Sequence, residues 1–183
     1  MLKNGVTSIV MKSVDGVQAA STNTSVLVAT NFTFNNINAS GTLDTDKQIA
    51  LTDYDMLTSL SSSNPKKLND GDPITYIYSY LYYDPQFVIK FKSAKTLSGV
   101  GILSSFTSYG YGVKKVTVET SLDGKSWTNM GTATATTQYD DDTSFPIVFS
   151  TPVKCQYVRL SHIETFDTGD YPCFAISEIG AYE

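Results

Sequence analysis

One loop of the sequence carries the residue types that bind a hard divalent cation. Asp70 and Asp72 lie two positions apart, and Gly71 between them permits a sharp turn that could bring their oxygens to one centre. Calcium takes roughly six to eight oxygen ligands, from carboxylates and carbonyls, at about 2.4 Å. The residues from Asn69 to Pro73 are also typical of an ordinary turn. On this loop alone, the turn is the better interpretation.

A second group of residues suits the recognition of sugars. Tyr109 and Tyr111 alternate with glycines between two expected strands, which would leave both rings on an exposed loop. Sugars present an apolar C–H face that stacks on aromatic rings, while their hydroxyls need carboxylates and amides nearby. The loop from Glu164 to Tyr171 offers both kinds of group. The candidate ligand-binding residues are Tyr109, Tyr111, Asp167, Asp170 and Tyr171. For any one of them, an ordinary Tyr-rich loop is the simpler interpretation.

Another cluster of aromatic residues precedes these loops. It consists of Tyr76, Tyr78, Tyr80, Tyr82 and Tyr83. Because the first members alternate along the chain, half of the cluster would pack on a sheet if the segment is a strand.

Residues that could perform catalysis are sparse. His162, with Glu164 and Asp167, resembles a fragment of acid–base machinery, but no serine lies in a recognisable nucleophile motif. A histidine at the end of a strand is the simpler interpretation. The run from Asp140 to Asp142 could supply paired carboxylates for glycoside hydrolysis, yet like charges on a loop are usually solvated. We therefore expect no catalytic residues and no enzyme.

The composition favours strands to hold these loops. The 183 residues fit one domain, or one domain with an arm, and such a chain can bury roughly 70% of its unfolded surface. Only 17% of the residues are charged, while Ser, Thr, Val and Tyr are abundant. The net charge of −5 and the lack of a basic patch argue against a nucleic-acid or anionic-membrane partner. No segment is long enough to span a membrane.

Histidine and cysteine are too few for a zinc site of the His/Cys type. The chain has one histidine, and its two cysteines are Cys155 and Cys173. Each cysteine opens a separate apolar run, so we expect both to be reduced, although a single disulfide between them stays open.

The order of elements follows from the hydrophobic pattern. Thr52 and Asp55 approximate a capping box, which predicts a short helix over residues 53–60. Asp123-Gly124 predicts a tight hairpin turn. Expected strands near the N-terminus cover residues 25–29 and 31–34, and later ones cover residues 87–91, 100–103, 116–120, 145–149, 157–163 and 174–182. This spacing is typical of an all-β antiparallel sandwich or jelly roll.

Four segments in order resemble the factor 5/8 type C (discoidin) domains and the related family 32 carbohydrate-binding modules. They are Asp84 to Ile89, Val116 to Trp127 with its "SLDGKSW", Lys154 to Leu160 with "YVRL", and Ile176 to Tyr182 with "ISEIGAY". The resemblance implies a discoidin-like, galactose-binding-like jelly roll of eight strands over about residues 65–183, with the first and last strands near each other. Members of the family mostly bind glycans, lipid head groups or proteins through loops at one end, and they are not enzymes.

The resemblance also changes the interpretation of the acidic loop. Family 32 modules hold a structural calcium ion in the corresponding loop, and a glutamate on the last strand completes the site. The matching residues here are the Asp70 and Glu178 side chains and the Thr75 hydroxyl and carbonyl. The carbonyls of Lys67, Asp72 and Ser177 would complete the shell. With Glu178 included, we favour a structural calcium site over a simple turn.

Residues 1–45 differ from the rest and are expected to form an N-terminal extension or docking arm, with the discoidin-like domain over residues 46–183. Met1-Leu2-Lys3 is followed by no apolar signal-peptide core. The chain is therefore either a form without its signal or a protein not secreted by that route.

Two functions fit these patterns. The first is a non-catalytic glycan-binding module that acts outside the cell, at a cell or virion surface, in cell adhesion for example. The second is a structural or assembly subunit of a virion or surface appendage, which would contact other protein subunits through the N-terminal arm.

Overall fold

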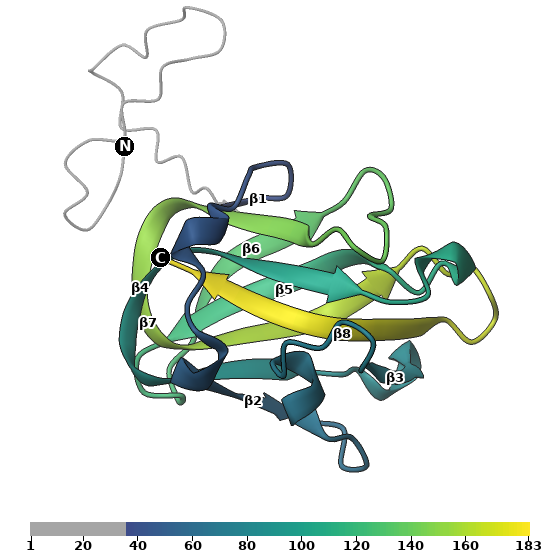
Figure 1. Ribbon diagram of the computed structural model, residues 1–183, viewed down its shortest axis with the longest axis horizontal. Helices are drawn as coiled ribbons and strands as arrows, with labels where there is room; N and C mark the ends of the chain where they lie inside the picture. The colour runs from purple at the N-terminus through teal and green to yellow at the C-terminus, as the bar shows by residue number, and fades with distance from the viewer. Residues whose placement is uncertain (1–35) are drawn as a thin grey trace, which may run out of the picture. The chain divides into compact units, whose positions relative to one another are not determined.

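The computed structural model describes residues 36–183 as an antiparallel β-structure without α-helices (Figure 1). The strands are β1 (Ile37–Asn38), β2 (Tyr54–Thr58), β3 (Ile77–Tyr80), β4 (Phe87–Ser104), β5 (Val113–Ser121), β6 (Thr128–Thr134), β7 (Phe145–Thr165) and β8 (Cys173–Tyr182). Short 3-10 turns connect them: η1 (Thr45–Lys47), η2 (Leu51–Asp53), η3 (Pro65–Leu68), η4 (Leu81–Tyr83) and η5 (Thr107–Tyr109). The expected all-β sandwich is confirmed.

The two longest strands, β4 and β7, run side by side through both layers of the sandwich (Figure 1). The first part of β4 pairs with β2 and with residues 157–160 of β7, which in turn pair with β5. After register shifts, the second part of β4 pairs with β8 and with residues 145–148 of β7. One layer is therefore β2-β4-β7-β5-β6, and the other is β3-β8-β4-β7-β1.

The core lies between these layers and follows the alternation of each strand. Phe87, Ile89 and Phe91 of β4 are fully buried, as the alternating pattern predicts. The Phe87 ring meets the ring of Phe174 from β8 edge-on, with centroids 5.7 Å apart. Because the two phenylalanines come from opposite layers, their contact helps to close the sandwich.

The two ends of the predicted domain meet. β3 pairs with β8, from Ile77 opposite Ile176 to Tyr80 opposite Cys173. The expectation that the first and last strands of residues 65–183 lie near each other is confirmed.

The predicted helix over residues 53–60 is wrong. Only the 3-10 turn η2 forms, and its cap residue Ala50 supplies no side-chain cap, so Thr52 does not cap a helix. The next residues form β2, in which Tyr54 and Met56 are buried and Asp55 is exposed. Pairing with β4 overrides the local helix signal. As a strand, this segment buries the side chains of Tyr54 and Met56, which a short solvated helix would leave exposed.

The remaining predictions divide between the described and undescribed parts of the chain. The expected strands at residues 25–29 and 31–34, and most of the arm at residues 1–45, lie outside the described residues. Within the described part of that range, β1 pairs with β7, and Ile37 lies opposite Phe149.

Cys155 and Cys173 are both buried and free. Among residues 36–183, no helix is long and apolar enough to cross a membrane.

Candidate functional site

The loop between β4 and β5, residues 105–112, is held in place by the loop between β6 and β7. The Asp141 carboxylate accepts hydrogen bonds from the Thr107 hydroxyl (2.5 Å), the Thr107 N–H (2.8 Å) and the Phe106 N–H (3.2 Å). The Gln138 side-chain amide donates to the Thr107 carbonyl. Partial burial opposes ionisation of Asp141, but these hydrogen bonds lower the pKa of the carboxyl below its ordinary value. The sequence suggested that this run of aspartates is simply solvated, but the Asp141 carboxylate is bonded to the 105–112 loop.

The same loop packs against the loop between β7 and β8, residues 166–172. Gly110 has a φ of 85°, and a Cβ built there would lie 2.9 Å from the Asp167 nitrogen. The Phe166 N–H donates to the Gly112 carbonyl, and the Ala175 N–H donates to the Tyr111 carbonyl, both at 3.3 Å. The two loops that the sequence singled out therefore lie side by side.

An aromatic pocket of about 380 Å³ opens between this loop and β3. The Tyr109 ring stacks on Tyr111 with centroids 5.9 Å apart and planes at 28°. Tyr111 in turn contacts Tyr78 of β3, with centroids 5.6 Å apart. The lining residues are Tyr76, Tyr78, Phe106, Tyr109 and Tyr111.

The predicted ligand-binding residues fall into two groups. Tyr109 and Tyr111 line the aromatic pocket, and Tyr109 is 69% exposed. Asp167 is occupied within its own loop, because its carboxylate accepts from the Gly169 and Cys173 N–H groups at 2.9 Å each. Asp170 and Tyr171 are exposed on the neighbouring loop but do not line the pocket.

Sequence reasoning missed the part of the pocket that β3 supplies. The expectation that half of the tyrosines at residues 76–83 pack on the sheet is wrong, because Ile77 takes the inward position and the tyrosines on either side point outward. The Tyr78 hydroxyl lies 3.1 Å from the Cys173 sulfur, and this hydrogen bond raises the pKa of Tyr78. Phe106 was also missed, since nothing in its sequence context marks it as a loop residue with a φ of 54°.

A wider groove of about 890 Å³ connects this region to the acidic loop. Its lining includes Ile74 and Tyr76, Leu103 and Phe106, and the run from Asp140 to Asp142. Ile74 is 80% exposed, and the Lys67 Nζ lies 5.8 Å from the centre of the Tyr76 ring. The aromatic pocket and the acidic loop are therefore neighbours on one surface.

The acidic loop gathers its oxygens around one hydroxyl. Thr75 Oγ1 lies 2.8 Å from Asp70 Oδ2, 3.3 Å from the Asp72 carbonyl oxygen and 3.5 Å from the Lys67 carbonyl oxygen. A hydroxyl has one proton to donate, so it can satisfy only one of these three acceptors. The loop's own N–H groups bond two of these residues as in a turn, since the Asp72 N–H donates to the Asp70 carboxylate and the Thr75 N–H donates to the Asp72 carbonyl. The same oxygens are of the kind that a hard cation takes as ligands.

Glu178 on β8 reaches the same loop. Its Oε1 accepts from the Gly71 N–H at 2.8 Å, although the two residues are 107 positions apart. Burial and the neighbouring Asp70 carboxyl together raise the pKa of Glu178 to about 7. Ser177 is fully buried, and its hydroxyl donates to the Leu103 carbonyl. Within residues 36–183, no three acidic, His or Cys side chains converge on one point, so a cation here would take most of its oxygens from the backbone and Thr75.

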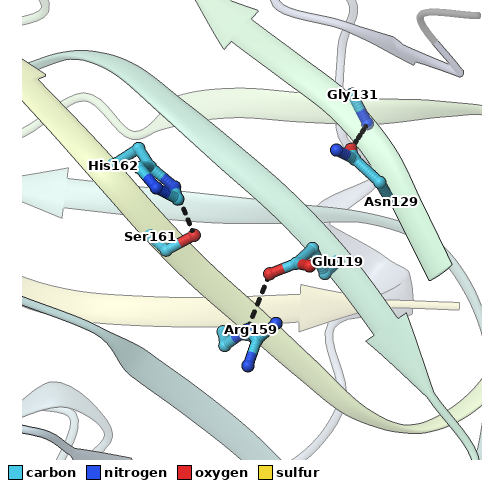
Figure 2. Close-up of polar contacts among 6 residues, drawn as sticks. All are labelled: Glu119, Asn129, Gly131, Arg159, Ser161 and His162. Carbon is cyan, nitrogen blue, oxygen red and sulfur yellow. Dashed lines mark hydrogen bonds and ion pairs between the residues drawn. The ribbon is translucent and has the colours of Figure 1, made fainter. Parts of the chain in front are cut away.

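The candidate catalytic residues are dispersed. His162 Nδ1 lies 3.1 Å from its neighbour Ser161 Oγ (Figure 2), whereas Glu164 pairs with Lys115 at 2.6 Å. Asp167 is held by backbone N–H groups, as described above. An ion pair of the same length joins Arg159 and Glu119 at 2.6 Å (Figure 2).

Arg159 also has a packing partner. Its guanidinium lies 4.3 Å from the centre of the Trp127 ring. This stacked ion pair bridges β5 and β7, and we assign it a structural role.

Comparisons with known proteins agree with this architecture. The F5/8 type C domain family model matches residues 57–179. A two-domain protein of unknown function from Bacteroides fragilis has 20% identity and a TM-score of 0.69. The match covers 81% of this chain and 48% of that protein, so the chain spans about half of that protein's length. A search of curated proteins found no match.

Two similar structures from Clostridium perfringens are single modules. The module CBM32-3 of a family 31 glycoside hydrolase has 20% identity and a TM-score of 0.64, with 75% of this chain and 95% of that chain covered. The family 32 module of NanJ, solved with galactose, has 13% identity and a TM-score of 0.59 over 75% of this chain and 98% of that one. These likenesses show a shared fold. Since the family model covers most of the chain and the sandwich matches it, this protein belongs to the F5/8 type C (discoidin) domain family.

Proposed function

We propose that this domain is a non-catalytic module that recognises carbohydrate through the aromatic pocket. The observation that carries the proposal is the convergence of five aromatic side chains from residues 76–78 and the 105–112 loop, with Tyr109 largely exposed. Such rings stack on the apolar faces of sugars. Support also comes from similar structures solved with galactose and with GalNAc-β-1,3-galactose.

The loop that bears Asp141 has a supporting part in this function. By holding residues 106 and 107, Asp141 fixes the start of η5 and hence the direction in which Tyr109 projects. A preformed pocket loses less conformational entropy when it binds its ligand.

We also propose that the acidic loop holds a structural calcium ion. The side chains of Asp70, Thr75 and Glu178 would bind it, together with the carbonyls of Lys67, Asp72 and Ser177. The ion would neutralise two adjacent carboxyl groups and tie η3 to β8, behind the wall of the groove. It would do no chemistry on the ligand.

A glycan of a cell surface is the partner that this proposal implies, and the place of action is outside the cell. The alternative role, an assembly subunit of a virion or surface appendage, depended on residues 1–45. Most of these lie outside the described residues, so that role stays a prediction.

A glycan array probed with the full chain tests the proposal. We expect a defined set of glycans to bind, and Tyr109→Ala to abolish binding because it removes the most exposed face of the pocket. Leu122→Ala, a change to an exposed apolar residue at the β5–β6 turn, is the matched control and should bind normally. The proposal is wrong if no glycan binds, or if Tyr109→Ala binds as well as the control.

A further inference from the structure

The aromatic pocket is one part of a longer row of rings. Eight aromatic residues contact one another in succession, with neighbouring centroids between 3.9 and 6.5 Å apart. We call this set the aromatic row; in spatial order it is Tyr76, Phe106, Tyr109, Tyr111, Tyr78, Tyr80, Tyr82 and Tyr83. The last three lie beyond the pocket, on β3 and η4.

The distal part of the row is open to solvent. Tyr80 is 42% exposed, Tyr82 is 69% exposed and Tyr83 is 55% exposed. These rings are not part of the hydrophobic core, because Ile77 is the residue of β3 whose side chain is buried there. Exposed apolar side chains that lie next to one another, in contrast to scattered ones, are typical of binding surfaces.

The chemistry of the row selects its ligand. Its eight side chains are uncharged at neutral pH, and seven of them carry a phenol hydroxyl at the edge of an apolar ring. A pyranose ring is similar in size to a phenol ring and likewise combines an apolar face with hydroxyls at its edge. This combination of apolar faces and edge hydroxyls therefore suits a carbohydrate chain better than a charged peptide or a nucleic acid.

We propose that the aromatic row binds an extended carbohydrate chain, with several successive sugar rings lying along it from the pocket to Tyr83. This inference rests on the proposed function and specifies its ligand class, a linear glycan in place of a single terminal sugar. The row continues the pocket without a break, because Tyr111 contacts Tyr78, which contacts Tyr80. The pocket would bind one unit of the chain, and the tyrosines of β3 and η4 would bind the units that follow.

The test uses the full chain and a series of linear oligosaccharides. Isothermal titration is carried out with β-1,4-linked galacto-, xylo- and cello-oligosaccharides, from monosaccharide to hexasaccharide. In the series that binds, we expect affinity to rise by about tenfold or more between the shortest and longest members. Tyr82→Ala should remove most of this rise while leaving the affinity for the shortest ligand unchanged. Tyr82→Phe keeps the ring face and should behave as the unmodified protein does.

The outcomes separate this inference from the proposed function. If affinity does not depend on chain length, or Tyr82→Ala leaves the length dependence intact, the extended site is refuted while single-sugar binding in the pocket stands. If no sugar of any length binds, and the array is also negative, both proposals fail together. Sedimentation that shows a dimer broken by Tyr82→Ala would also overturn the inference, because the row would then contact a second copy of this chain.

Discussion

The Asp141 carboxylate organises the 105–112 loop from outside it. We predict that Asp141→Ala loosens residues 106–109, since three donors lose their common acceptor. A net hydrogen bond contributes about 1 kcal/mol, and each kcal/mol lost lowers the melting temperature by roughly 2–4 °C, so the loss of all three bonds should lower it by roughly 6–12 °C. Hydrogen exchange at the Phe106 and Thr107 amides should quicken. Asp142→Ala is the control, because its carboxylate accepts only from adjacent Thr143, and equal effects of the two changes would contradict the prediction.

The same residue gives the loop a pH dependence with a definite sign. The folded protein lowers the pKa of Asp141. The carboxylate therefore contributes fully to the stability of the fold at pH values above its ordinary pKa in the unfolded chain. This contribution is lost as the pH falls through the lower, folded pKa. Acid should therefore lower the protection of the Phe106 and Thr107 amides in the unmodified protein, measured as exchange relative to the intrinsic rate at each pH, and Asp141→Ala should remove that acid-dependent component.

Asp70 tests the calcium proposal at the level of single ligands. An unfolded chain cannot bring Asp70 and Glu178 together, so calcium should bind the folded state alone and raise the free energy of unfolding. The gain is about 2.7 kcal/mol when free calcium exceeds the dissociation constant about a hundredfold. EDTA should lower the melting temperature, calcium should restore it, and Asp70→Ala should abolish this response.

Asp72 provides the matched control for that experiment. Its side chain accepts from the Ile74 N–H, and its expected ligand is the backbone carbonyl. Asp72→Asn should therefore keep the calcium response. A melting temperature that responds to neither EDTA nor calcium would show that the loop binds no ion.

The elements of the site depend on how closely two loops approach. At Gly110 the φ of 85° disfavours any side chain, and an added Cβ would meet the backbone of Asp167. We predict that Gly110→Ala costs roughly 1–2 kcal/mol in backbone strain and separates the 105–112 loop from the 166–172 loop. Thermal unfolding and glycan titration should show losses of both stability and affinity.

Gly112→Ala is the control in the same loop. Gly112 has an ordinary φ, and the nearest atoms to an added Cβ belong to the Thr107 and Gln138 side chains at 3.3–3.4 Å. Side chains can adjust where backbone cannot, so this variant should lose less stability. If Gly112→Ala loses more stability than Gly110→Ala does, then the contact between the two loops is not the reason that position 110 needs a glycine.

At the scale of the whole molecule, β4 and β7 join the two layers into one unit. We predict that residues 36–183 unfold in a single transition, because neither layer can open without breaking both strands. The fluorescence of Trp127 reports on the β5–β7 layer. The thiol of Cys173, in a Cys155→Ala background, reports on the β8 layer. The two denaturant midpoints should coincide, and distinct midpoints would mean that the layers open separately.

The sequence by itself determined the strands and the family. Alternation around Phe87, Ile89 and Phe91 identifies a half-buried strand, because its period of two is a local property of the chain. The turn at Asp123 and Gly124 is equally local, although residues 122–127 form a longer connection than the predicted tight hairpin. Gly124 has a φ of 71°, and the Asp123 carboxylate accepts from the Lys125 and Ser126 N–H groups. The four ordered segments around these elements were sufficient to indicate the discoidin fold.

Tertiary structure decided which residues join Tyr109 and Tyr111 in the pocket. The local signal at residues 53–60 favoured a helix, but pairing with β4 made it a strand. The tyrosines of β3 acquired their outward direction only when Ile77 was placed against β8. Asp141 and Glu178 lie far along the chain from the loops they contact, and no local pattern specifies such pairs. Convergence of distant side chains is a property of the packed sandwich, and for this reason the fold could be predicted from the sequence while most of the aromatic row could not.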